Sequence, residues 1–210
     1  MFNFRKKKQI YNSDKYWKNE GKQYFTNYIK MPELIIKRYD AQADLIIKFI
    51  KDLKFASICE AGCGFGRITE KISKTFQIPK EKYLAFDISE DQIKKARELS
   101  DHCAQFKTSS ILELQTDSKF DLVLASEVLM HIPHEKIKEN ISKLVNLSSK
   151  YVVNIDWKET DSSKSSFCNF AHDYKKIYES LGLKVKTFLL DDYAELEDKI
   201  NQTLYLAEIQ

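Results

Sequence analysis

The amino-acid sequence predicts an α/β fold in which a doubly wound, mostly parallel sheet of seven strands carries helices on both faces. The first observation is that short apolar segments alternate along the chain with segments of helical periodicity, as they do in parallel sheets. The second is that three of the five glycines in the 210 residues, Gly62, Gly64 and Gly66, lie together after the first apolar segment. Glycine allows tight turns and close approach of the backbone, so this loop is expected to lie against a ligand.

The composition limits the class of protein. Hydrophobic residues make up 43% and aromatic residues 12% of the chain, enough to form a globular core and to exclude intrinsic disorder. The net charge, 34 − 31 = +3, gives no strong signal for nucleic-acid binding. No apolar segment is long enough to span a membrane, and no signal region follows the basic N-terminus, so we expect a soluble, cytoplasmic protein.

Cysteine spacing gives no sign of a metal or of a disulfide framework. Cys59, Cys63, Cys103 and Cys168 form neither a CxxC pair nor the Cys/His spacing of a zinc site. We expect four reduced thiols, mostly buried, and no metal ion.

The chain divides into an extension, residues 1–31, and a main domain, residues 32–210. The extension is basic and rich in aromatic residues. One interpretation is a helix that packs its aromatic side chains on the domain and keeps its lysines in solvent. The alternative is a cap over the active site.

The elements of the main domain follow in order from periodicity and turn signals. Helical spacing begins after Pro32, Ser89 and Gln92 have the spacing of a capping box, Asp173 is a candidate N-cap, and Gly182 is a natural helix stop. We expect helices at about 34–53, 67–76, 89–99, 134–147 and 173–181. We expect strands at about 55–61, 82–86, 103–108, 120–125, 151–155, 184–190 and 202–209.

Acidic residues mark the ends of the first two expected strands. Glu60 precedes the glycine loop, and Asp87 lies where a carboxylate can accept both hydroxyl hydrogens of a ribose. The loop reads GxGxG and not the dinucleotide pattern GxGxxG, because Arg67 replaces the last glycine. A carboxylate at Glu60 would repel a pyrophosphate but suits an ammonium or sulfonium group. The sequence therefore favours a cationic nucleoside ligand.

These segments resemble the Rossmann-like, class I S-adenosylmethionine-dependent methyltransferases over about residues 55–209. Glu60 with the three glycines matches the first family motif, and Asp87 matches the second. In the third motif Ser110 replaces the usual Asp, so the serine hydroxyl or the Ile111 amide would contact the adenine. Residues 120–132 resemble the fourth motif of members that methylate small molecules.

The resemblance implies S-adenosylmethionine as cofactor and S-adenosylhomocysteine as product. The positions that would bind the cofactor are Glu60, Ala61, Gly62, Gly64, Gly66, Asp87, Ile88, Ser110, Ile111, Ser126 and Glu127. Related enzymes often close over the cofactor with an N-terminal aromatic residue and a cation, and the candidates here are Tyr16, Trp17 and Arg38. Aromatic packing and a surface arginine are the alternative interpretation of these three.

Methyl transfer needs an aligned nucleophile, and a base where that nucleophile is protonated. His131, after the fourth strand, is the first candidate base; the alternative is a structural histidine bonded to a loop carbonyl. His172 is the second candidate. Asp156 and Trp157, at the end of the fifth strand, are candidates for substrate binding.

The predicted function is methyl transfer to an oxygen or nitrogen of a small molecule or sugar-containing metabolite. Residues 125–128 lack the Asn or Asp followed by Pro-Pro and an aromatic residue that amide and adenine amino methylation would predict. Two alternatives stay open: an RNA or protein methyltransferase, and a non-catalytic, cofactor-binding partner subunit. The sequence does not indicate an oligomeric state.

Overall fold

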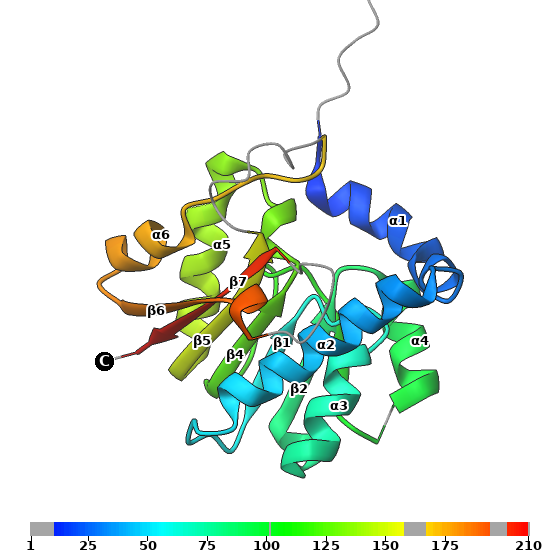
Figure 1. Ribbon diagram of the computed structural model, residues 1–210, viewed down its shortest axis with the longest axis horizontal. Coiled ribbons are helices and arrows are strands. Elements are labelled where there is room, and N and C mark those ends of the chain that lie inside the picture. Colours follow the sequence, from blue (N-terminus) through cyan, green and yellow to red (C-terminus); the bar gives the residue numbers. More distant parts are fainter. Residues whose placement is uncertain (1–10, 101, 158–166, 194–200, 210) are drawn as a thin grey trace, which may run out of the picture.

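The computed structural model describes residues 11–100, 102–157, 167–193 and 201–209, and its centre is a seven-stranded sheet (Figure 1). The strands are β1 (Ile58–Ala61), β2 (Tyr83–Asp87), β3 (Gln105–Thr108), β4 (Phe120–Ser126), β5 (Ser148–Trp157), β6 (Lys184–Leu189) and β7 (Gln202–Glu208). The helices are α1 (Ser13–Tyr28), α2 (Glu33–Ile50), α3 (Arg67–Phe76), α4 (Glu90–Ser100), α5 (His134–Leu147) and α6 (Tyr174–Ser180).

The strand order is β3-β2-β1-β4-β5-β7-β6. Strands β1 to β5 are parallel, and β7 runs antiparallel between β5 and β6. The order reverses between β1 and β4, and ligands of open α/β sheets bind beyond the carboxyl ends of the strands at such a reversal. The predicted fold class, a mostly parallel sheet with helices on both faces, is confirmed.

Alternation along the strands divides the core into two layers. On β4, Leu122 and Leu124 pack with the apolar sides of α2, α3 and α4, and Val123 and Ala125 pack with α5 and α6. All four side chains are fully buried, so each central strand is covered on both faces. In Figure 1, α2 crosses in front of the sheet, with α5 and α6 on its other side.

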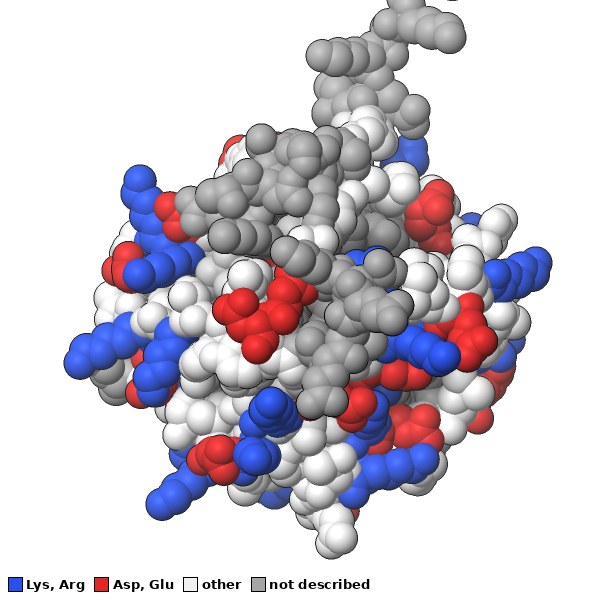
Figure 2. Space-filling view, in the orientation of Figure 1, with Lys and Arg blue, Asp and Glu red and all other residues white. Residues whose placement is uncertain are grey.

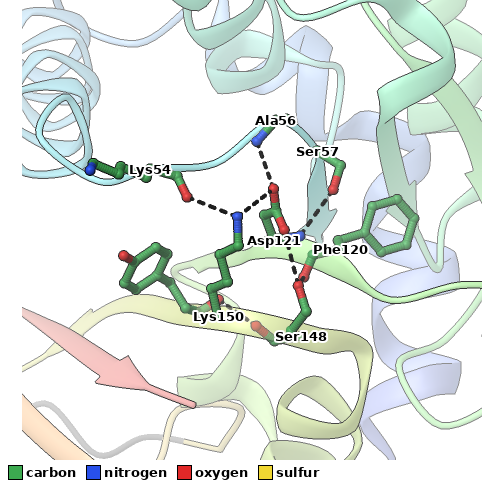
Figure 3. Close-up of polar contacts among 9 residues, drawn as sticks. Lys54, Ala56, Ser57, Phe120, Asp121, Ser148 and Lys150 are labelled. Carbon is green, nitrogen blue, oxygen red and sulfur yellow. Dashed lines mark hydrogen bonds and ion pairs between the residues drawn. The ribbon is translucent and has the colours of Figure 1, made fainter. Parts of the chain in front are cut away.

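A polar cluster joins strands at the end of the sheet opposite to the glycine loop (Figure 3). The Asp121 carboxylate accepts a hydrogen bond from the Ala56 amide at 2.8 Å and pairs with Lys150 Nζ at 3.1 Å. Ser149 Oγ donates to its other oxygen at 3.1 Å, and the Asp121 amide donates to Ser57 Oγ at 3.0 Å. Burial raises the pKa of Asp121, but these donors outweigh it and leave the pKa below its ordinary value. The cluster therefore stabilises the fold while the carboxylate is ionised.

Helix α1 docks on the start of α4 through backbone contact. The Gln92 side chain donates to the Gly21 carbonyl oxygen at 2.5 Å. A Cβ atom at Gly21 would lie 2.1 Å from Ser89 Oγ, so only glycine permits this approach. The Gln92 amide still donates to Ser89 Oγ at 3.3 Å, as the capping box requires. The Gln92 side chain is turned to α1 instead of closing the box, which corrects half of that prediction.

The other caps and most boundaries agree with the sequence. Asp173 accepts a hydrogen bond from the Lys176 amide at 2.8 Å, and Gly182 has φ +80°. Strand β5 is longer than expected, Ser148–Trp157 instead of 151–155. Its start is extended by the pairing of Ser148 with Phe120 on β4, and its end by the pairing of Asp156 and Trp157 with β7. All four cysteines are free thiols, and only Cys168 is partly exposed.

Charge is mixed over the surface. Figure 2 shows lysine and arginine side chains interspersed with acidic ones on the visible face. Within the described ranges, no helix is both long enough and apolar enough to cross a membrane, and no group of three His, Cys, Asp or Glu side chains could hold a metal ion.

Candidate active site

A cavity of about 390 Å³ opens at the carboxyl ends of β1, β2 and β4, where the strand order reverses. Its walls include residues from α1, the glycine loop, the ends of β2 and β4, and the segment after β4. The lining residues discussed below are Trp17, Gly21, Tyr24, Tyr39, Glu60, Gly62, Gly64, Arg67, Asp87, Ile88, Gln92, Ser110, Ile111, Ser126, Glu127, His131 and Trp157. The fold thus brings most of the predicted site residues to one place.

The glycine loop forms the floor of the cavity. Gly62, Gly64 and Gly66 all have positive φ, at +68°, +55° and +86°, which L residues with side chains rarely adopt. At Gly62 a Cβ atom would also lie 2.3 Å from Val128 Cγ2. The loop therefore presents backbone, not side chains, to a ligand.

Asp87 is held at the end of β2 by main-chain donors. Its Oδ2 accepts from the Gly64 amide at 3.0 Å, and its Oδ1 accepts from the Ser89 amide at 2.8 Å. Burial raises the pKa of Asp87, and the hydrogen bonds from Ser89, Gly64 and Ile88 act in the opposite direction. The carboxylate is thus fixed in orientation and lines the cavity, where its remaining lone pairs can accept hydroxyl hydrogens.

Glu60 is a buried carboxyl group beside the same loop, with an exposed fraction of 3%. Its Oε2 accepts hydrogen bonds from Thr69 Oγ1 at 2.6 Å and from the Tyr83 hydroxyl at 2.7 Å. Burial raises its pKa to about 7 despite these two donors. A cation bound in the cavity would favour the ionised form of Glu60.

Glu127 follows β4 in a left-handed conformation, φ +56°, that is uncommon for a residue with a side chain. Its Oε1 accepts a hydrogen bond from Gln202 Nε2 at 2.6 Å. Burial raises the pKa of Glu127, while hydrogen bonds from Gln42 and Gln202 and the charge of Arg67 oppose that shift. Two carboxyl groups, Glu60 and Glu127, therefore line one cavity.

His131 lies at the end of the short 3-10 turn after β4. Its Nδ1 lies 2.9 Å from the Cys168 carbonyl oxygen, and its ring lies 4.3 Å from that of Trp17 between centroids. A carbonyl accepts only, so Nδ1 carries the proton, and Nε2 is the nitrogen of the neutral ring that keeps a lone pair. The Asn169 side chain also hydrogen-bonds the ring. Burial lowers the pKa of His131, so the neutral form persists below the ordinary histidine pKa. The contact with a loop carbonyl is the one that the structural interpretation predicts, and it sets the tautomer that a base would require.

Ser126 Oγ and Gln92 Oε1, both on residues of the cavity wall, are buried without a hydrogen-bond partner in the described chain. Buried polar groups are nearly always hydrogen-bonded in native proteins. Unpartnered acceptors and hydroxyls beside a glycine loop fit a ligand that supplies polar hydrogens, as an adenosine does. The residues present therefore fit the predicted cofactor.

Three predicted residues close to the cavity face the interior of the protein instead. Asp156 is fully buried behind the turn, where it accepts from the Met130 amide at 3.2 Å. Ala61 points into the core layer of α5 and α6, and Gly66 lies against the Ala96 side chain on α4, which a Cβ atom would meet at 3.4 Å. The prediction that both Asp156 and Trp157 face the substrate is therefore corrected. Neighbouring side chains of a strand point in opposite directions, and of these two only Trp157 lines the cavity.

Three further predicted residues also lie outside the cavity lining. His172 is buried, with its Nε2 2.9 Å from the Ile132 carbonyl oxygen. Tyr16 packs against the Trp17 ring at 5.3 Å between centroids, so of these two aromatic residues it is Trp17 that lines the cavity. Arg38 is absent from the lining, where Arg67 is found.

Several lining residues carried no signal of function in the sequence. Tyr24 and Tyr39 look like core aromatics, and Gln92 looks like a capping residue. For Arg67, the only indication of a role in the site was its position directly after the glycine loop. It donates to the Tyr39 carbonyl oxygen at 2.5 Å and to Gln42 Oε1 at 3.0 Å. Arg67, and not Arg38, is therefore the arginine of the cavity wall.

The comparisons with known proteins agree with this geometry. Residues 58–150 match the family model described as a methyltransferase domain. This segment is therefore similar to a methyltransferase domain. It starts at β1 and includes the glycine loop, Asp87, Glu127 and His131. The rest of the cavity wall comes from segments before and after it.

Solved structures of methyltransferases have a similar fold. Magnesium protoporphyrin IX methyltransferase from Synechocystis PCC 6803, solved with bound S-adenosylmethionine, has a TM-score of 0.76 at 16% identity, over 97% of this chain and 100% of its own. The N-methyltransferase NodS from Bradyrhizobium japonicum WM9, solved with S-adenosylhomocysteine, has a TM-score of 0.70 at 15% identity, over 94% and 98% of the two chains. These likenesses confirm the class I methyltransferase fold.

One curated relative aligns along most of the sequence. An uncharacterized protein of Methanocaldococcus jannaschii is 28% identical over 170 residues, which cover 76% of this chain and 66% of the relative. The chain thus spans slightly less than two thirds of that protein.

Proposed function

We propose that this protein transfers the methyl group of S-adenosylmethionine to an oxygen or nitrogen atom of a small molecule. One observation carries the proposal: a single cavity at the strand-order reversal holds the glycine loop, Asp87 and two carboxyl groups suited to a cation. The methyltransferase domain model covers the residues that form this floor.

The cavity offers each part of the cofactor a partner of matching chemistry. Asp87 would accept the ribose hydroxyl hydrogens, and its two main-chain bonds to Gly64 and Ser89 hold it in place for this. Ser110, Ile111 and the unpartnered Gln92 Oε1 would face the adenine, as wall residues beyond β2 and β3. Glu60 and Glu127 would stabilise the positive charge at the methionine end.

When bound, S-adenosylmethionine supplies an electrophilic methyl group on a sulfonium centre. The chain's own residues then align the acceptor and exclude water, which is the main requirement of an in-line displacement. Trp17 and His131, in ring contact, form one wall at this end. For a protonated hydroxyl or amine acceptor, His131 Nε2 would take the proton, because its Nδ1 is already bonded to the Cys168 carbonyl.

The small-molecule class is supported by the enclosure of the acceptor end. Helix α1 contributes Ser13, Asp14 and Trp17 to the wall, and Asn169 contributes from the segment after the fifth strand. A pocket with walls from these separate segments favours a small acceptor group over a flat polymer surface. The Synechocystis enzyme is named for magnesium protoporphyrin IX, a small molecule, which supports the same class.

The test is transfer of a labelled methyl group from S-adenosylmethionine into a fractionated lysate, followed by mass spectrometry. We expect label in the small-molecule fraction, and none with an Asp87→Ala, His131→Ala double variant. Label that is lost on treatment with ribonuclease or protease would support the RNA or protein alternative. Binding of the cofactor with no labelled product in any fraction would favour the non-catalytic subunit.

A further inference from the structure

A continuous chain of hydrogen bonds joins three separate elements, α3, α2 and β7, and ends on Glu127, which directly follows β4. Arg67 on α3 donates to Gln42 Oε1 on α2 at 3.0 Å, and Gln42 Nε2 donates to Gln202 Oε1 on β7 at 2.7 Å. Gln202 Nε2 then donates to Glu127 Oε1 at 2.6 Å. The two glutamines lie 160 positions apart in the sequence, so only the fold brings them together.

The chemistry of the two ends fixes the direction of this chain. A guanidinium group only donates hydrogen bonds, and an ionised carboxylate only accepts them. If either amide were flipped, its NH₂ group would face the guanidinium or its oxygen would face the carboxylate. Gln42 and Gln202 are therefore locked in one orientation, with their donors pointing towards Glu127.

The side-chain amides of Gln42 and Gln202 are both shielded from solvent. Their exposed fractions are 1% for Gln42 and 5% for Gln202. Buried amides bring a desolvation cost that apolar side chains of similar size avoid, so packing alone does not call for them. Their hydrogen bonds instead fix the carboxylate of Glu127, which lines the cavity and has a positive φ.

We propose that Gln42 and Gln202 are positioning residues, which hold the Glu127 carboxylate in place to bind the ammonium group of the cofactor's amino-acid end. The inference rests on the proposed function and deepens it. Neither glutamine is in the cavity lining, so each acts through Glu127 and not on the ligand.

The experiment compares two ligands by titration calorimetry. S-adenosylhomocysteine carries the ammonium group, and 5′-methylthioadenosine lacks the whole amino-acid end. For Gln202→Leu we expect affinity for S-adenosylhomocysteine to fall about tenfold, because the buried carboxylate loses its donor, and affinity for 5′-methylthioadenosine to stay within about twofold. Gln42→Leu, on a different element, should give the same selective loss. Thr203→Val is the matched control, a buried neighbour on the opposite face of β7.

A double-mutant cycle tests the route through Glu127. In a Glu127→Gln background, Gln202→Leu should cause no further loss of S-adenosylhomocysteine affinity. An equal loss for both ligands, no loss for either, or a full further loss in the Glu127→Gln background would each overturn the inference. Failure of the wild-type protein to bind either ligand would instead refute the proposed function.

Discussion

The main-chain amide of Gly64 donates a hydrogen bond to Asp87 Oδ2 across 3.0 Å, which ties the glycine loop to the end of the second strand. The Ser89 amide holds the other oxygen at 2.8 Å. The carboxylate therefore needs no rearrangement to meet a ligand, and preorganisation of this kind increases affinity.

Replacing Asp87 with alanine should weaken S-adenosylmethionine binding by about 1–3 kcal/mol, because ribose hydroxyls would be buried without an acceptor. Calorimetry measures the change directly. Asp91→Ala, an exposed acidic residue on the following helix, is the control and should bind normally. Unchanged affinity of Asp87→Ala would contradict the assignment.

Cofactor affinity should depend on pH through Glu60. Its pKa of about 7 in the free protein means that a proton must leave before the carboxylate can stabilise a cation. We expect affinity to rise as pH increases from about 6 to 8 and then to level off, with proton release on binding at the acid end. Glu60→Gln should weaken this dependence and leave only the part due to Asp87 and Glu127, whose pKa values burial also raises. A wild-type affinity that is flat over this range would contradict the prediction.

The contact of Gly21 with Ser89 should be essential to the docking of α1. Gly21→Ala raises intrinsic helix propensity, yet its methyl group would overlap Ser89 Oγ. We expect weaker S-adenosylhomocysteine binding and a shift in Trp17 fluorescence. Ser89→Gly in the same chain should restore both, since it removes the atoms that collide and a glycine cap costs only a few tenths of a kcal/mol. No rescue in the double variant would show that the loss has another cause.

His131→Ala should lower turnover by about 10²–10⁴-fold while leaving cofactor affinity unchanged, because the residue lies at the acceptor end of the cavity. Burial lowers the pKa of His131, so wild-type turnover should hold through about pH 6.5 and fall only in more acidic solution. Steady-state rates against pH give both results. His134→Ala, on the exposed start of α5, is the control. Equal turnover of His131→Ala and wild type would leave it a structural residue.

Asp121→Asn should reduce the free energy of unfolding by about 1–2 kcal/mol at neutral pH, since it removes the charge that Lys150 and Ala56 hold. A lowered pKa means that the stabilisation is present above the unfolded-state value, near 4, and is lost as pH falls through the folded-state value. Urea unfolding curves should therefore converge in acid. Asp117→Asn, exposed before the same strand, should be close to neutral.

The sequence predicts the fold well because its signals are local. Periodicity, the glycine cluster and the acidic strand ends each depend on residues within a few positions of one another. The same local signals predict the cavity residues at the strand ends, from Glu60 and the glycine loop to Asp87 and His131. Element bounds shifted by a few residues, as with β5, whose end depends on pairing with β7, a strand far along the chain.

The walls of the site were harder to predict because long-range contacts set them. Gln202 meets Glu127 only through the insertion of β7 beside β5, and Gln92 turns to α1 only because Gly21 lies against Ser89. Asp156 lies at a strand end and His172 lies before a helix. Neither position indicates that the side chain is buried and hydrogen-bonded to the backbone, as both are.

The Gly21 contact places an outer helix directly on the wall of the cofactor cavity. Trp17 and Tyr24 on that helix lie before the methyltransferase domain match at 58–150, as Trp157 and Asn169 lie after it. Under the proposed function, these two flanks would determine which acceptor is admitted, and the central segment would bind the cofactor. A chimera that exchanges only α1 and the segment after β5 is the natural way to move acceptor selectivity between relatives of this fold.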